Sequence, residues 1–163
     1  MDSELLPIYL NDHLAGSTAA LELVRRLLRS NSRNDYGPDL ARLASEIEQD
    51  RKSLLAVMSD LAVGADRVKL VLGWAAEKVG RLKLNGRWLS YSPLSRLMEL
   101  EVLGLGVTGK LALWRALLQL TPDEPRLDRG ELERLIERAA GQLQEVEALR
   151  ERAVADALEP PDR

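Results

Sequence analysis

The chain has 163 residues, of which 45% are hydrophobic, 30% charged and 4% aromatic, and this composition is typical of a helical protein. The length suits one domain with a substantial core, so we treat residues 1–163 as a single helical-bundle domain. The absence of cysteine excludes disulfides, thiolate metal sites and thiol nucleophiles, and the net charge of −3 gives no general attraction to nucleic acid.

The first residues, MDSELLP, lack the basic-then-apolar layout of a signal peptide, and no uncharged apolar run approaches the length of a membrane span. We therefore expect no membrane span. A chain without cysteine also suits a reducing compartment, so we expect a cytoplasmic protein.

The first predicted helix begins after Ser3 and runs to about Ser30. His13, the only histidine, lies on the flank of its apolar stripe, and Glu22 lies one step off that stripe. A single histidine without partners at its own level favours a structural or surface role over metal binding. Residues 31–39 form a turn cluster around Gly37-Pro38.

The second predicted helix covers about 39–62, with Asp39 as its cap and Gly64 as its end. Asp50 interrupts its apolar stripe, and Glu46 lies beside the stripe. Because a buried carboxylate needs a partner, we expect Asp50 to form a structural ion pair rather than to act in catalysis. The candidate partners are Arg25, Arg51 and Arg115.

Residues 65–82 have the pattern of another amphipathic helix, and Asn85-Gly86 is a turn signal that would close a small hairpin. The segment 66–96 contains seven basic and two acidic residues with three aromatic residues among them. It is either a patch for an anionic partner or a solvated crossover, and the composition favours the crossover.

The third helix of the bundle is predicted from Ser92, with Pro93 in the first position, to Leu120. It is apolar on most sides, so we expect it at the centre of the fold. Its glycines, Gly104, Gly106 and Gly109, indicate close approach of a neighbouring backbone or a local break. After two prolines in residues 121–128, Asp128 caps a last helix that runs to about Leu158.

Counting from the turns places four glutamates at similar heights, because residues equally far from a short turn face each other in antiparallel helices. Glu22 and Glu46 are equally far from residue 34, and Glu101 and Glu147 are equally far from residue 124. The segment between the second and third helices is long enough to return along the whole bundle. One glutamate from each helix therefore falls in one layer.

This arrangement resembles the ferritin-like superfamily of rubrerythrin and bacterioferritin type. Those bundles join two antiparallel helix pairs by a long crossover, and place Glu on two helices and Glu-x-x-His on the other two. Here Glu22 and Glu101 match the lone glutamates, while Gln49 and Arg150 stand where the histidines following Glu46 and Glu147 would be. The resemblance implies a four-helix bundle that has lost its di-iron site.

The layer has three interpretations. The glutamates are solvent-facing charge, or a buried polar network neutralised by Arg150, or a working carboxylate site for a hard ion such as manganese. Because the histidines are absent, we expect no metal and no cofactor.

The leading functional hypothesis is a non-catalytic structural or protein-interaction module, forming a homodimer or binding another protein. The alternatives are a carboxylate-rich iron- or manganese-binding protein, and a module that binds an anionic partner through segment 66–96.

Overall fold

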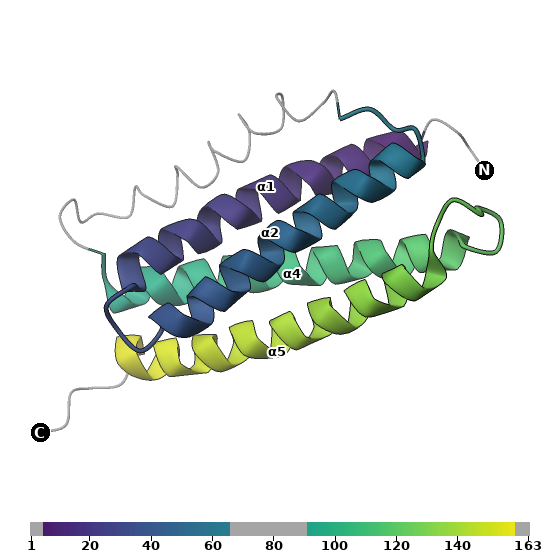
Figure 1. The fold of residues 1–163 in the computed structure, drawn as a ribbon. Helices are drawn as coiled ribbons and strands as arrows, with labels where there is room; N and C mark the ends of the chain where they lie inside the picture. Colours follow the sequence, from purple (N-terminus) through teal and green to yellow (C-terminus); the bar gives the residue numbers. More distant parts are fainter. Residues whose placement is uncertain (1–4, 66–90, 159–163) are drawn as a thin grey trace, which may run out of the picture.

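The computed structural model of the chain describes residues 5–65 and 91–158. These residues form four long helices and no strand (Figure 1). They are α1 (Leu5–Asn31), α2 (Gly37–Asp60), α4 (Pro93–Leu120) and α5 (Arg129–Leu158). The predicted all-α class is therefore confirmed, whereas the helix expected at 65–82 and the hairpin expected at Asn85-Gly86 lie outside the described residues.

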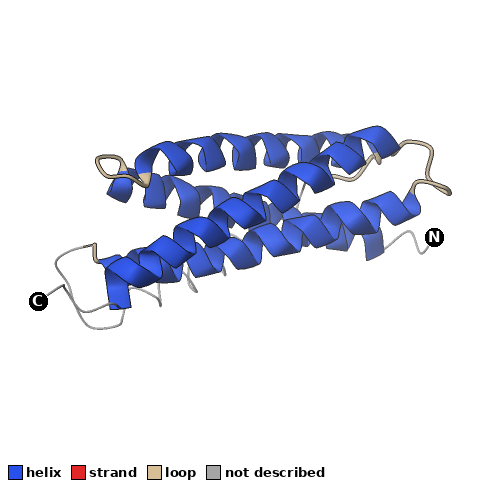
Figure 2. Ribbon diagram, turned by 90° about the horizontal axis from the view of Figure 1, so that it is seen from below, coloured by secondary structure: helices blue, strands red, loops and turns tan. Residues whose placement is uncertain are grey.

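The helices form two antiparallel pairs, α1 with α2 and α4 with α5 (Figures 1 and 2). In addition, α1 packs against α4 and α2 against α5, so α2 and α4 lie diagonally across the bundle. Asn11 near the start of α1 donates to the carbonyl of Gly64 (3.0 Å), and Asn31 at its end donates to the hydroxyl of Tyr91 (2.9 Å). The chain thus leaves α2 and enters α4 at opposite ends of the bundle.

Two of the predicted helix starts are confirmed by their capping bonds. The hydroxyl of Ser92 accepts from the backbone N–H of Ser95 (3.2 Å), and Pro93 follows as the first residue of α4. The carboxylate of Asp128 accepts from the backbone N–H of Glu131 (2.9 Å) at the start of α5. These caps satisfy amide groups that have no partner within the helix.

The predicted ends of α2 need correction. The helix starts at Gly37, so Asp39 lies in its first turn and does not cap it. It stops at Asp60, and Ala62, rather than Gly64, takes the left-handed conformation with φ of 56°. The backbone N–H of Val63 then donates to the carbonyl of Met58 (2.8 Å), which closes the end of the helix.

The core divides into two apolar clusters, one in each half of the bundle. The first cluster is centred on Val24, Leu27, Leu40, Leu43, Leu100, Leu103 and Val146. The second is centred on Leu10, Leu14, Leu54, Met58, Trp114, Leu117 and Leu135. All four helices contribute to both clusters, so packing along the whole bundle holds the helices together.

Helix α4 is continuous through its glycines. A Cβ added at Gly104 would meet the side chain of Val146 at 3.6 Å, and one at Gly106 would meet Ala20 at 3.7 Å. The close approach predicted for these glycines is therefore made by side chains rather than by a backbone, and no break occurs. None of the helices in the described part of the chain is long and apolar enough to cross a membrane.

The central position expected for α4 is not found. It is one of four helices around a shared core, and its outer face keeps large apolar side chains in solvent: Leu94, Met98 and Leu105 are 50%, 37% and 74% exposed. The apolar character of α4 on most sides reflects this exposed face as well as the core.

Candidate functional site

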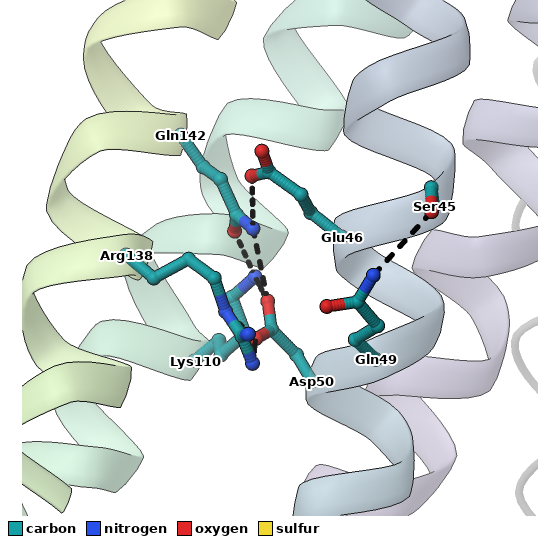
Figure 3. Close-up of polar contacts among 7 residues, drawn as sticks. All are labelled: Ser45, Glu46, Gln49, Asp50, Lys110, Arg138 and Gln142. Atoms are coloured by element: carbon teal, nitrogen blue, oxygen red, sulfur yellow. Dashed lines mark hydrogen bonds and ion pairs between the residues drawn. The ribbon is translucent and has the colours of Figure 1, made fainter. Parts of the chain in front are cut away.

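A polar layer crosses the middle of the bundle between the two apolar clusters. We define the central polar layer as Asp50, Lys110, Arg138, Gln142 and Glu46 (Figure 3). At this level α2, α4 and α5 each have polar side chains in place of the apolar ones that face the core above and below. The layer therefore places charged and amide side chains in the middle of the core.

Asp50 is the centre of this layer and is only 2% exposed. Its Oδ1 accepts from Nε of Arg138 (2.7 Å), and its Oδ2 accepts from the Gln142 amide (3.1 Å) and from the Lys110 ammonium. Both oxygens of this buried carboxylate are thus hydrogen-bonded, which a buried charge requires.

Gln142 connects the carboxylate of Glu46 to that of Asp50. Its Nε2 donates to Glu46 (2.9 Å) as well as to Asp50, and its Oε1 accepts from Lys110. Burial lowers the pKa of Lys110, and the adjacent Asp50 carboxylate opposes that change. Two carboxylates face two cations, so the layer balances its formal charges without a metal.

The burial predicted for Asp50 is confirmed, but its predicted partners are wrong. None of the three arginines forms an ion pair with Asp50: Arg25 pairs with Glu48, Arg51 donates to Thr18, and Arg115 lies exposed. The actual partners come from α4 and α5, and Lys110 reaches across the diagonal of the bundle.

The glutamates predicted to share a layer do not gather in the core. Their surroundings differ: Glu22, Glu101, Glu147 and Gln49 are exposed, while Glu46 is half-buried beside Gln142. Arg150 binds Glu147 of its own helix, with Nε to Oε2 at 2.8 Å. Of the three interpretations of the predicted layer, the burial of these residues favours solvent-facing charge.

The described residues offer no suitable donor set for a di-iron or di-manganese centre. Within 5–65 and 91–158, no group of three or more His, Asp or Glu side chains is placed to hold a metal ion. The two carboxylates of the central polar layer already accept hydrogen bonds from cations and an amide. A ferritin-type metal pair therefore does not fit the residues present.

A pocket with a volume of about 180 Å³ opens between α1, α2 and α4 beside the central polar layer. Its walls are mostly apolar and include the buried side chains of Leu54, Leu113 and Trp114. Sequence reasoning missed this pocket, although the small residues of α1 and α4 were a signal for it. Those that line it are Gly16, Ala20, Gly106 and Gly109.

His13 lies at this pocket rather than at a metal site. It is half-buried, and its ring packs edge-on against Tyr9 with 4.6 Å between the ring centres. Burial lowers the pKa of His13, and the neighbouring Asp12 partly offsets this. The imidazole is therefore mostly neutral at pH 7.

Of the basic residues in segment 66–96, only Arg96 lies in the described part of the chain. It is buried, donates to Asn31 (3.1 Å), pairs with Asp156 and lies 4.1 Å above the ring of Tyr36. These contacts join α1, α4 and α5 at one end of the bundle. Arg96 is thus committed to the fold, and the proposed patch for an anionic partner rests on residues outside the described ones.

Comparison of the chain with protein-family models, with curated proteins and with solved structures finds no match.

Proposed function

We propose that the chain is a non-catalytic helical bundle of ferritin-like type that acts as a protein-interaction module, with side-chain cations in place of a metal pair. The observation that carries this proposal is the central polar layer, in which Lys110 and Arg138 surround Asp50 in the middle of the core. Ferritin-like bundles hold their metals with carboxylates that project inward at such a position.

The order of the helices supports the ferritin-like part of the proposal. Two antiparallel pairs are present, and the chain leaves α2 beside Asn11 but enters α4 beside Asn31, at the other end of α1. A connection along the length of the bundle, carrying a further helix, is the ferritin-like arrangement that we propose for the residues between them.

The replacement of metal by cations follows from electrostatics. Carboxylates brought together in a core cannot all remain ionised unless positive charge compensates them. A metal pair supplies that charge in a ferritin-type site, whereas here an ammonium and a guanidinium supply it. Unlike metals, these cations offer no open coordination position, and so the layer supports structure rather than redox chemistry.

The interaction surface that we propose is the exposed apolar stripe of α4. Leu94, Met98 and Leu105 are separated by four and seven residues, which places them on one face of the helix. We propose a second copy of the same chain as the partner, forming a cytoplasmic homodimer through this stripe. Helix α5, by contrast, keeps only Leu158 as an exposed large apolar side chain among its described residues.

Metal analysis of protein purified without a metal-affinity tag tests the central claim. After incubation with Fe(II) or Mn(II) and desalting, we expect far less than one metal ion per chain. Exchanging both cations, by Lys110→Glu with Arg138→His, should create measurable affinity. The control is Arg134→His, which makes the same exchange on α5 at an exposed arginine that pairs with Glu131. Stoichiometric metal in the unmodified protein would instead support the iron- or manganese-binding alternative.

A further inference from the structure

The pocket between α1, α2 and α4 has the size of a small-molecule site. Its volume of about 180 Å³ exceeds that of cavities of about 150 Å³ that accept benzene in other proteins. The buried side chains of Leu54, Leu113 and Trp114 form apolar walls. A single aromatic ring or a short alkyl chain therefore fits the space.

The two residues of the central polar layer that line the pocket, Asp50 and Lys110, leave a donor rather than an acceptor free. The oxygens of Asp50 already accept bonds from Lys110, Arg138 and Gln142. Lys110 uses two of its three N–H donors in the bonds found among the described residues. The remaining hydrogen-bonding capacity of the interior thus suits a ligand that accepts.

Arg51 is the cation of the pocket that would favour a negatively charged ligand over a neutral one. Its Nε donates to the hydroxyl of Thr18 (3.2 Å), which fixes the stem, while its terminal nitrogens donate to no acceptor within the described residues. The one carboxylate not used in the central polar layer, Asp12, lies exposed at the rim, where water screens it. A guanidinium with free terminal nitrogens binds a carboxylate in fork geometry.

We propose that this pocket binds a small aromatic or short-chain carboxylate, with its apolar body against Trp114 and Leu113 and its carboxylate at Arg51. The proposed site does not use a metal, so the result of the metal analysis neither supports nor contradicts it. Benzoate is the probe that matches it in size and charge, and benzyl alcohol and benzylamine are its neutral and cationic counterparts.

Binding is measured by calorimetry and by the NMR shift of the Trp114 indole N–H, assigned with Trp114→Phe. We expect saturable benzoate binding, about tenfold tighter than that of benzyl alcohol, as one charge-assisted hydrogen bond would give. Arg51→Gln should remove this preference while keeping weak binding of both. The absence of saturable benzoate binding, or a preference for benzylamine, would overturn the proposal.

Two glycines allow the space itself to be tested. A Cβ added at Gly16 or Gly109 meets no atom within 4 Å, and both residues line the pocket. Gly109→Leu should therefore fill the pocket and abolish benzoate binding. Gly141→Leu is the control, because Gly141 has the same free space but lies exposed on α5, away from the pocket. Gly16→Leu replaces Gly109→Leu if the latter unfolds, and unchanged affinity in a folded filled variant would place the ligand elsewhere.

Discussion

Asp50 of α2 and Lys110 of α4 form a buried ion pair across the diagonal of the bundle, between helices whose backbones do not pack against each other. The pair lies between two apolar clusters and is shared with Arg138 and Gln142. Because a shift of one helix by a turn would separate these groups inside the core, we infer that the layer fixes the relative heights of α2, α4 and α5.

The first prediction concerns the energy of this layer. Asp50→Ala leaves the Lys110 and Arg138 cations without their shared carboxylate, so we expect a loss of about 3–5 kcal/mol in the free energy of unfolding. Urea unfolding followed by circular dichroism measures the change. The control is Glu22→Ala, which removes an exposed carboxylate and should be nearly neutral.

Replacing all the buried polar groups of the layer with apolar ones should affect the free energy of unfolding less than removing the Asp50 carboxylate alone. The combination of Asp50→Leu, Lys110→Met, Arg138→Met and Gln142→Leu substitutes apolar groups of similar size for the buried polar ones, and it should retain or exceed the stability of the parent. If Asp50→Ala proves as mild as Glu22→Ala, the carboxylate is not held by these cations in solution.

The second prediction concerns the titration of His13. Burial lowers its folded-state pKa below the ordinary value of 6.5, which the unfolded chain retains. At a pH between these two pKa values, the unfolded chain binds more protons at His13 than the folded protein does. The free energy of unfolding therefore falls as the pH drops from about 6.5 to the folded-state pKa, and His13 causes no further loss below that pKa. Because His13 is the only histidine, its ring proton signals give the pKa directly by NMR.

The variant His13→Gln isolates this contribution. Compared with the parent, it should lose less stability between about pH 7.5 and about pH 5.5, because the other groups titrate alike in both proteins. A measured His13 pKa at or above 6.5 would contradict the burial seen at the pocket.

The sequence predicted the helices and the burial of Asp50 because both follow from the spacing of apolar residues along one helix. It did not predict Lys110 as the partner, since a stripe does not specify how neighbouring helices are rotated. Helix α4 adds to this ambiguity, because residues such as Leu105 extend its apolar character to the exposed face.

The interpretation that the four glutamates form a layer in the core was wrong for a related reason. Counting from a turn gives the height of Glu22 or Glu147 along the bundle, but not the direction in which its side chain points. Both glutamates face solvent. The pocket was not predicted because it is an empty space beside Gly16 and Gly109. Such a space depends on how α1, α2 and α4 pack together, and the sequence of one helix does not specify that packing.

The third prediction uses the end of α2. Ala62 has φ of 56°, a conformation that disfavours residues with a Cβ and that glycine adopts readily. Ala62→Gly should therefore stabilise the protein by about 0.5–1 kcal/mol. The same substitution at Ala41, exposed in the interior of α2, should destabilise by about 1 kcal/mol, so the two variants differ in sign. Thermal unfolding that shows both variants destabilised would place Ala62 in an ordinary conformation.

The fourth prediction concerns association through α4. Leu105 is 74% exposed within the stripe proposed as the dimer surface. Light scattering after size exclusion should give the mass of a dimer at micromolar concentration, and Leu105→Glu should shift it to the monomer, because a buried unpaired charge is costly at an interface. Leu158→Glu, on the exposed end of α5, should leave the dimer intact. A monomeric parent protein would remove the hypothesis.

The last prediction compares two arginines of α5 that are equally exposed. The side chains of Arg138 and Arg150 are 31% and 30% exposed, so exposure alone gives them the same importance. Their partners differ, because Arg138 binds the buried Asp50 (2% exposed) whereas Arg150 binds Glu147 (52% exposed) on the surface of its own helix. Arg138→Ala should cost about 1–3 kcal/mol, since it removes a charged hydrogen bond from a desolvated carboxylate.

Arg150→Ala should leave the unfolding curve within the error of replicate measurements, because a solvated pair within one helix contributes little. Repeating Arg138→Ala in an Asp50→Asn background isolates the coupling between the two side chains, and the effect of the arginine should shrink there. If instead Arg150→Ala is the more damaging variant, the stabilising network lies among Glu22, Glu46, Glu101 and Glu147. The central role assigned to Asp50 would then be wrong.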